Sequence, residues 1–264
     1  MKHVWGFISI LIVTFAVLAA YSFSAKTIAI GNFEVKKTNI SKFIIGDTMP
    51  KEILFAMPVK EETPQMDSSK QVILLIGDSM LEQLRWAMRD YCEANGHELH
   101  TVMWYSSQSM WFGQYDTMKY FINKLNPTYV MLVLGANELF VSNIKDTRAE
   151  YVKKICNDAN PLPFIWVGPP NWKKDTGIND LILRYAKTGR YFPTHTISLD
   201  NPKFGRYKDG AHPLPSAANY WMDELASWIM EKSDYPILLN KPDQKGTMST
   251  NLSLIHISEP TRPY

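Results

Sequence analysis

Four short polar segments of the sequence carry residue types that could perform chemistry together. They are Gly77-Asp78-Ser79, the run at 105–109 (YSSQS), Gly135-Ala136-Asn137-Glu138, and the segment from Asp209 through His212 to Pro213. A serine attacks a carbonyl carbon when a histidine takes its proton, and an aspartate can orient that histidine. Amide groups then stabilise the developing oxyanion. The chemistry open to these residue types is acyl transfer through an acyl-serine intermediate.

Each segment taken alone also has a purely structural interpretation. Ser79 stands where a helix is expected to begin, and serine commonly caps helices at that position. An asparagine after a strand often marks a turn, and Asp209-Gly210 fits a type I turn. What favours shared chemistry is the order of the segments and their common location after predicted strands or just before the last predicted helix.

Apolar runs alternate with amphipathic segments, and this pattern predicts the elements that position these residues. Strands are expected at 71–76, 98–104, 129–134, 163–167 and 195–199. Helices are expected near 80–95, 114–125, 146–158, 178–189 and 216–231, the last capped by Ser216.

The predicted strands are short and apolar, which indicates a parallel sheet covered by helices on both faces. We therefore expect a three-layer, flavodoxin-like α/β fold with five parallel strands in the order 2-1-3-4-5. In such sheets ligands bind beyond the carboxyl ends of the strands, which is where the polar segments lie.

Length and composition indicate the size of the domain and exclude one class of binding partner. The chain has 264 residues, 45% of them hydrophobic, enough for one sizeable core with appendages. Its net charge is +2 and no basic run stands out, so we expect no nucleic-acid partner.

Cys92 and Cys156 are the two cysteines, which excludes metal sites built from cysteine pairs. They are either two buried thiols or one disulfide, and we expect neither a metal nor a cofactor.

The two ends of the chain differ from its middle. Residues 1–26 hold an apolar stretch long enough to cross a bilayer and predict a membrane anchor or a cleaved signal peptide. Residues 27–70 are typical of a stalk or linker with short β segments, and 71–235 form the main domain. The tail, 236–264, ends in LSLIHISEPTRPY, which resembles translated sequencing-adapter read-through. We expect residues from about 252 onward not to be native.

Three of the polar segments resemble sequence blocks of the SGNH hydrolase family, also called GDSL-type esterases. Gly77-Asp78-Ser79 matches the first block, Gly135-Ala136-Asn137 the third, and Asp209 through His212 the last. Glu138 stands where the third block carries an aspartate and is expected to hold its loop in place with a longer reach. The resemblance covers roughly residues 71–232 and implies the three-layer fold described above.

The resemblance also implies a role for each matched residue. Ser79 would be the nucleophile, His212 the base and then the acid, and Asp209 would orient the other ring nitrogen. The oxyanion hole would consist of the Ser79 N–H, the N–H near Gln108 and the side-chain amide of Asn137.

The second block departs from the family, which carries a glycine whose backbone N–H points into the site. Gln108 occupies the place expected for that glycine, and Gly113 is the alternative. Trp111 borders the same loop, while Asn171 and Trp172 follow the fourth predicted strand. We expect these three side chains to contact substrate, although tryptophans at such positions also commonly fill a core.

The resemblance implies a serine esterase or O-acyltransferase acting on O-acyl groups, with acetyl expected, of a cell-envelope or extracellular carbohydrate. The domain would lie outside the cytoplasm, membrane-anchored through its N-terminal segment, or secreted if that segment is cleaved. Exported relatives often work beside a membrane-bound O-acyltransferase, so either water or a sugar hydroxyl is a candidate acceptor. The altered second block and Glu138 favour an alternative, an inactive SGNH-fold polysaccharide-binding or scaffold protein of the cell envelope.

Overall fold

The computed structural model describes residues 14–15, 29–30, 33–34, 64–243 and 253–257, which fall into two compact units, 1–61 and 62–264. The described part of the first unit includes a short antiparallel pair, β1 (Ala29–Ile30) and β2 (Phe33–Glu34). The predicted anchor at 1–26 lies outside the described residues except for 14–15. Among the described residues, no helix has the length and apolar character needed to span a bilayer.

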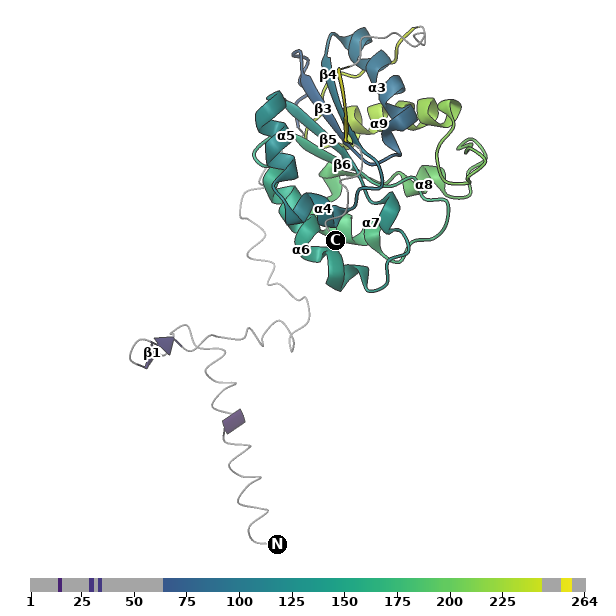
Figure 1. Ribbon diagram of the computed structural model, residues 1–264. Helices are drawn as coiled ribbons and strands as arrows, with labels where there is room; N and C mark the ends of the chain where they lie inside the picture. The colour runs from purple at the N-terminus through teal and green to yellow at the C-terminus, as the bar shows by residue number, and fades with distance from the viewer. Residues whose placement is uncertain (1–13, 16–28, 31–32, 35–63, 244–252, 258–264) are drawn as a thin grey trace, which may run out of the picture. The chain divides into compact units, whose positions relative to one another are not determined.

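The second unit is built on a parallel sheet (Figure 1). Its strands are β3 (Val72–Gly77), β4 (Glu98–Trp104), β5 (Tyr129–Val133), β6 (Phe164–Val167), β7 (Tyr191–Phe192) and β8 (Ser253–Ile257). They lie in the order β7-β6-β5-β3-β4-β8, and every neighbouring pair is parallel. From β4 across to β7 the order is 2-1-3-4-5, so the predicted topology is confirmed.

Helices cover both faces of the sheet, because successive residues of each strand point to opposite sides. Ile73 and Leu75 pack with α3 (Leu81–Asn95) and α9 (Pro215–Lys232) on one face. Leu74 and Ile76 pack on the other face with α4 (Ser109–Gln114), α5 (Thr117–Leu125), α6 (Ile144–Ala159) and α7 (Ile178–Ala186).

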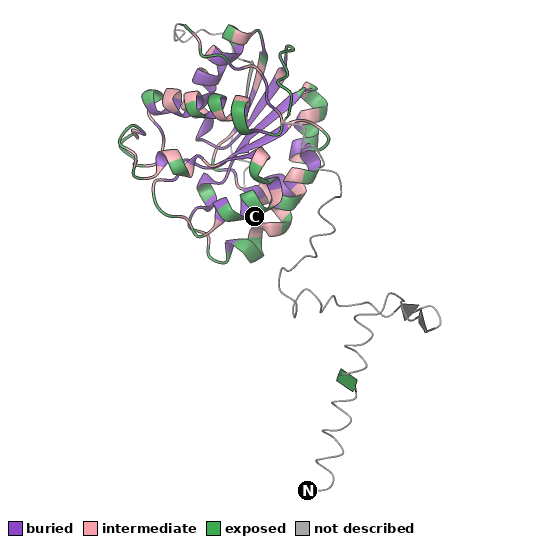
Figure 2. Cartoon of the chain, turned by 180° about the vertical axis from the view of Figure 1, so that it is seen from behind, coloured by how far each residue is buried: buried purple, intermediate pink, exposed green. Residues whose placement is uncertain are grey.

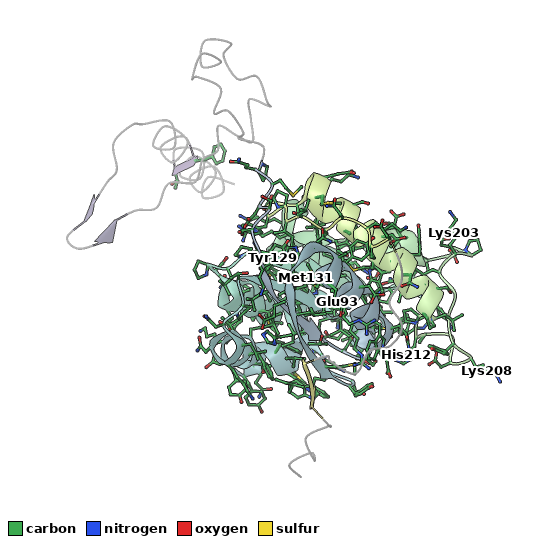
Figure 3. All side chains as sticks on the ribbon, turned by 90° about the horizontal axis from the view of Figure 1, so that it is seen from above. Glu93, Tyr129, Met131, Lys203, Lys208 and His212 are labelled. Carbon is green, nitrogen blue, oxygen red and sulfur yellow. The ribbon has the colours of Figure 1, made fainter. Side chains whose placement is uncertain are left out.

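The strands are accordingly buried in the middle layer while the outer helix faces are exposed (Figure 2). Tyr129 and Met131 of β5 lie inside the domain, whereas Lys203 and Lys208 project from its outer rim (Figure 3). Cys92 and Cys156 are free thiols, the first buried and the second half-buried.

The fifth predicted strand, 195–199, is wrong. The edge strand is β7, which is only two residues long, and the predicted segment instead forms the short helix α8 (His195–Ser198). Pro193 follows β7 directly and has no N–H to donate to the sheet, so the strand ends there. The chain then turns into helical hydrogen bonds, such as the Leu199 N–H to the His195 carbonyl.

Helix boundaries also differ from prediction. The helix predicted near 114–125 corresponds to α5, which begins at Thr117, and the short helix α4, which ends at Gln114, was not predicted. The last helix begins at Pro215 with Leu214 as its N-cap, so Ser216 is not the cap. Proline suits the first helical position because the N–H that it lacks would have no partner there.

The folded unit extends beyond 71–235 at both ends. Asp67 pairs with Ile237 through a parallel bridge, and Ile237 and Leu239 are buried against the α3 and α9 face. β8 adds a sixth strand beside β4 and falls in the segment expected not to be native. An apolar segment of any origin can pair with an open sheet edge. The pairing of β8 therefore does not test whether residues from about 252 onward are native, and that point stays a prediction.

Gly77 ends β3 beside the backbone of Val133, the last residue of β5. A Cβ at this position would lie 1.9 Å from the Val133 carbonyl oxygen, a backbone atom that cannot rotate away. We expect Gly77→Ala to lower the free energy of unfolding by about 3 kcal/mol, measured by urea denaturation. Gly96→Ala should cost less, about 1 kcal/mol, since a Cβ there meets nothing within 4 Å and only its φ of 73° opposes alanine. Unchanged stability of Gly77→Ala would contradict the close approach.

Candidate active site

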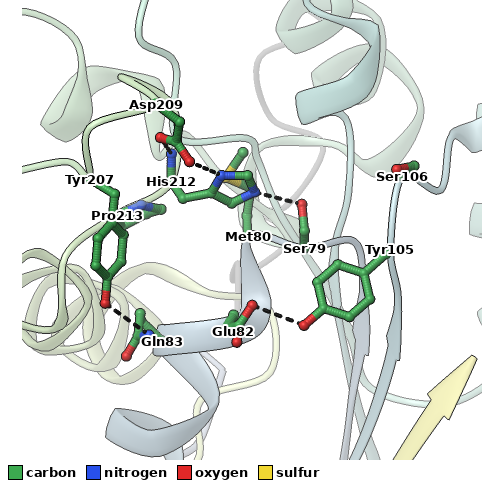
Figure 4. Close-up of a pocket in the computed structure, with 10 residues that line it drawn as sticks. All are labelled: Ser79, Met80, Glu82, Gln83, Tyr105, Ser106, Tyr207, Asp209, His212 and Pro213. Atoms are coloured by element: carbon green, nitrogen blue, oxygen red, sulfur yellow. Dashed lines mark hydrogen bonds and ion pairs between the residues drawn. The ribbon is translucent and has the colours of Figure 1, made fainter. Parts of the chain in front are cut away.

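Ser79, His212 and Asp209 form a continuous hydrogen-bonded chain at the carboxyl end of the sheet. The Ser79 Oγ lies 2.9 Å from His212 Nε2, and His212 Nδ1 lies 2.7 Å from Asp209 Oδ2 (Figure 4). Ser79 and His212 are 133 residues apart in the chain. The structure therefore brings together the three residues that the sequence assigned to nucleophile, base and orienting carboxylate.

The hydroxyl of Ser79 does not cap α3. The N-cap of that helix is Met80, and no side chain provides a capping hydrogen bond. The carbonyl of Ser79 accepts from the Glu82 N–H, while its side chain turns to His212. Of the two interpretations open for this serine, helix cap or partner of a base, the geometry supports the second.

Asp78 holds the turn that presents Ser79. It is fully buried, its N–H donates to the Val133 carbonyl, and its Oδ1 accepts from the Met80 N–H at 3.0 Å. Burial raises the pKa of Asp78 to about 7, against the opposing effect of backbone N–H groups that include those of Met80 and Ala136. This aspartate therefore ties the end of β3 to the loop after β5, as expected for a structural residue.

Asp209 shapes the loop that carries His212, residues 207–213, called here the histidine loop. Its Oδ1 accepts from the backbone N–H groups of Ala211 and His212, and its Oδ2 faces His212 Nδ1. These contacts, the Ala211 N–H first among them, lower the pKa of Asp209 to about 2. Because the carboxylate can only accept, Nδ1 carries the ring proton and Nε2 is left to accept the serine proton.

Arg206 is a positioning residue that the sequence analysis missed. Its Nη1 donates to the Ala211 carbonyl at 2.5 Å, and its Nη2 donates to the Asn171 carbonyl at 2.7 Å and the Pro170 carbonyl at 3.2 Å. The arginine thus fastens the histidine loop to the loop after β6. Every acceptor is a backbone carbonyl, which any residue type supplies, so no sequence signal could have shown these contacts.

Asn137 and Glu138 are adjacent in one turn of 3₁₀ helix, η2 (Ala136–Glu138), and their side chains point in different directions. Asn137 is exposed, and its Nδ2 donates to the Ser107 carbonyl at 3.0 Å, which fixes the amide beside the loop after β4. Gly135, with a φ of 124°, allows the chain to enter this turn, since other residues rarely adopt that angle. One N–H of the Asn137 amide remains to donate to an oxyanion.

Glu138 points the opposite way and is completely buried. It accepts from the Ser109 N–H at 2.8 Å and the Ser109 Oγ at 2.7 Å, and it pairs with Arg148 Nε at 2.8 Å. The longer side chain therefore reaches the start of α4 and fixes the residue next to Gln108. We expected Glu138 to hold its own loop, the one after β5; its contacts instead tie that residue to Ser109, after β4, and to Arg148 of α6.

Gln108 rather than Gly113 fits the position of the second backbone donor. Gln108 has extended backbone angles, φ −129° and ψ 162°, which any residue adopts, so glycine is not needed there. In the described part of the chain the N–H groups of Gln108 and Ser79 have no hydrogen-bond partner. Gly113 lies inside α4, where a Cβ would come within 2.5 Å of the Tyr151 Cα. Its role is close packing of α4 on α6.

No protein-family model and no curated protein matches this chain. Solved structures similar to it include the psychrotrophic esterase EstA from Pseudoalteromonas sp., at 16% identity and a TM-score of 0.44, covering 59% of this chain and 94% of that one. Another is the C-terminal catalytic domain of peptidoglycan O-acetyltransferase A (OatA) from Streptococcus pneumoniae, at 18% identity and a TM-score of 0.39, covering 60% and 92%. Likeness at this level carries no conclusion about activity.

A pocket of about 430 Å³ opens beside Ser79 (Figure 4). It is lined by Ser79, Met80, Glu82, Gln83, Tyr105, Ser106, Tyr207, Asp209, His212 and Pro213. The three side chains expected to contact substrate are not among them.

The structure gives each of those three side chains another environment. Trp111 packs on Trp104 with ring centroids 5.3 Å apart. Asn171 is only 1% exposed, and its amide is satisfied by Lys173, Asp175 and Asn179, so it shapes its own loop. Trp172 contacts Phe140 edge-on and lines a separate cleft of about 830 Å³. None of the three lines the pocket beside Ser79, and their contact with substrate stays a prediction.

Asn137→Ala removes the one side-chain donor of the expected oxyanion hole. We expect kcat for 4-nitrophenyl acetate to fall about 10²- to 10³-fold with little change in KM, because the lost hydrogen bond forms mainly in the transition state. Asn157→Ala, at an exposed position on α6, is the matched control and should leave kcat unchanged. A loss below about threefold in Asn137→Ala would show that the amide does not face the oxyanion.

Proposed function

We propose that this protein is a serine esterase or O-acyltransferase of the SGNH type. The observation that carries the proposal is the chain of two hydrogen bonds from the Ser79 hydroxyl through His212 to the Asp209 carboxylate. A serine hydroxyl is a poor nucleophile at neutral pH without a base beside it. Here the base lies within hydrogen-bond distance of it and is oriented by a carboxylate on the same loop.

The reaction follows from these positions in two halves. Ser79 attacks the ester carbonyl while His212 Nε2 takes the hydroxyl proton, and Asp209 stabilises the resulting imidazolium. The oxyanion is met by the N–H groups of Ser79 and Gln108 and by the Asn137 amide. His212 then gives its proton to the departing alcohol, which leaves an acyl group on Ser79. Water or a second alcohol attacks that acyl group, again with His212 as base, and free Ser79 is restored.

We further propose that the acyl group is acetyl and that the alcohol belongs to a carbohydrate of the cell envelope or extracellular matrix. Eight of the ten residues that line the pocket have polar side chains, which supports a hydroxyl-rich substrate. The apolar N-terminal segment supports a domain held outside the cytoplasm, where a membrane-bound O-acyltransferase is a fitting partner.

The inactive-scaffold alternative rested on Gln108 and Glu138. Both now have a structural account, since Gln108 has an ordinary backbone conformation and Glu138 anchors Ser109. No observation at the site favours this alternative over the enzyme.

Acetate release tests the proposal and separates its two forms. The purified protein is incubated with an acetylated glycan, and free acetate is measured with and without added unacetylated glycan. Hydrolysis predicts acetate in both cases, whereas transfer predicts acetylated acceptor in place of acetate. If neither product forms, and 4-nitrophenyl acetate is also not hydrolysed, the proposal is wrong.

A further inference from the structure

Two tyrosines line the pocket beside Ser79, and the hydroxyl of each is hydrogen-bonded to a side chain of α3. Tyr105, from the loop after β4, donates its hydroxyl to Glu82 Oε2 at 2.9 Å. Tyr207, from the histidine loop, accepts from Gln83 Nε2 at 3.2 Å. Both partners sit in the first turn of α3, directly after the nucleophile (Figure 4). The polar groups of Glu82 and Gln83 therefore lie between two tyrosines within one turn of the reacting hydroxyl.

The pocket carries negative charge that no cation within it balances. Its ten lining residues include two carboxylates, Glu82 and Asp209, and neither lysine nor arginine. Asp209 is committed to His212. Glu82 lines the pocket without a cation among the lining residues, so its carboxylate can act on an alcohol or sugar that enters beside Ser79.

Arg85 acts on the Glu82 carboxylate at a distance, and in the described part of the chain no hydrogen bond joins the two side chains. Arg85 stacks on Trp86 at 4.4 Å, and its Nε donates to the backbone carbonyl of Glu82 rather than to the side chain. Lys208 follows Tyr207 but projects outward from the rim (Figure 3). Across a solvated rim its charge is screened within about 8 Å at physiological ionic strength.

Glu82 keeps one oxygen available for a ligand. Tyr105 occupies Oε2, and burial, reinforced by the bond to Glu82, raises the pKa of the Tyr105 phenol, which keeps it a donor. Oε1 has no partner within the part of the chain that the structure describes. A sugar hydroxyl could donate to it, whereas a sugar carboxylate would be repelled by it.

We propose that Glu82 is a specificity-determining residue that makes the pocket select neutral, hydroxyl-rich sugar esters over those of uronic acids. This inference rests on the proposed function and names the charge class of its substrate. The carboxylate acts on the substrate ring beside the reacting ester and takes no part in the proton transfers at Ser79.

The test compares two esters that differ in one charge. They are methyl 4-O-acetyl-glucopyranoside and methyl 4-O-acetyl-glucopyranosiduronate, assayed by acetate release at 0.15 M salt. We expect kcat/KM to favour the neutral ester about tenfold in the wild-type protein. In Glu82→Gln the ratio of kcat/KM for the neutral ester to that for the charged ester should fall to about one. Both values come from the same variant, so a change in its overall activity does not alter the ratio.

Glu93→Gln is the matched control. It removes the same charge from the same helix, at an exposed side chain near the far end of α3, and should keep the tenfold preference. Glu82→Ala replaces the glutamine variant if the latter does not fold. A wild-type ratio near one, or a preference that survives the loss of the Glu82 carboxylate, would overturn the inference while the esterase proposal stands. Absence of hydrolysis for both sugar esters and for 4-nitrophenyl acetate would overturn both.

Discussion

Ser79→Ala is expected to reduce kcat for ester hydrolysis by about 10⁴-fold or more, to the level left by the oxyanion donors and substrate binding alone. The residue is 9% exposed, and among the residues that the structure describes its hydroxyl bonds only to His212, so its removal takes the nucleophile and little else. The measurement is steady-state hydrolysis of 4-nitrophenyl acetate, with thermal unfolding recorded on the same samples.

The control for this variant is Ser216→Ala. Ser216 is an exposed serine in the first turn of α9 and has no place in the site, so both kcat and the midpoint of unfolding should stay unchanged. Residual activity of Ser79→Ala above about one tenth of wild type, in a sample free of contaminating esterase, would show that another group is the nucleophile.

Glu138→Ala is expected to lower the free energy of unfolding by about 3–5 kcal/mol. The substitution leaves the Arg148 guanidinium without its buried partner and leaves the Ser109 N–H, with its hydroxyl, without an acceptor. Because Ser109 follows Gln108, we also expect the second oxyanion donor to lose its fixed position. Urea denaturation and kcat, measured separately, report the two effects.

Two further variants make the Glu138 result specific. Glu138→Gln keeps an acceptor for Ser109 but loses the charge that pairs with Arg148, so its stability should lie between wild type and Glu138→Ala. Glu150→Ala removes an exposed glutamate that pairs with Lys153 on the surface of α6 and should cost less than about 1 kcal/mol. If Glu138→Ala is as stable as Glu150→Ala, the buried pair does not hold the loop.

The sheet order could be predicted because apolar runs leave a short-range signal, and the candidate catalytic residues because three segments resemble SGNH sequence blocks. Apolar runs of four to seven residues separated by amphipathic segments fix a parallel sheet, and the carboxyl ends of its central strands meet at one place. Ser79, Asn137 and His212 each follow or precede an element whose position was evident. The fifth strand failed because β7 is two residues long, too short to produce a periodicity.

The support around the site could not be predicted, because it depends on contacts between distant segments. Glu138 reaches Ser109, and Arg206 reaches the Asn171 carbonyl, without any pattern in the chain that links them. The same limit applies to Asn171, which follows a strand as a ligand-binding residue would but whose amide turns inward to Asp175 and Asn179. Position along a strand predicts the edge of the sheet that a residue occupies, and packing decides which way its side chain points.

An activated serine at position 79 is the central claim, and covalent labelling tests it most directly. The purified protein is treated with a fluorophosphonate, its intact mass is measured, and the modified peptide is located by tandem mass spectrometry. The account predicts one adduct per chain, on Ser79, no adduct in Ser79→Ala, and greatly slowed labelling in His212→Gln. A folded wild-type protein that stays unlabelled, or a label that persists in Ser79→Ala, would contradict it.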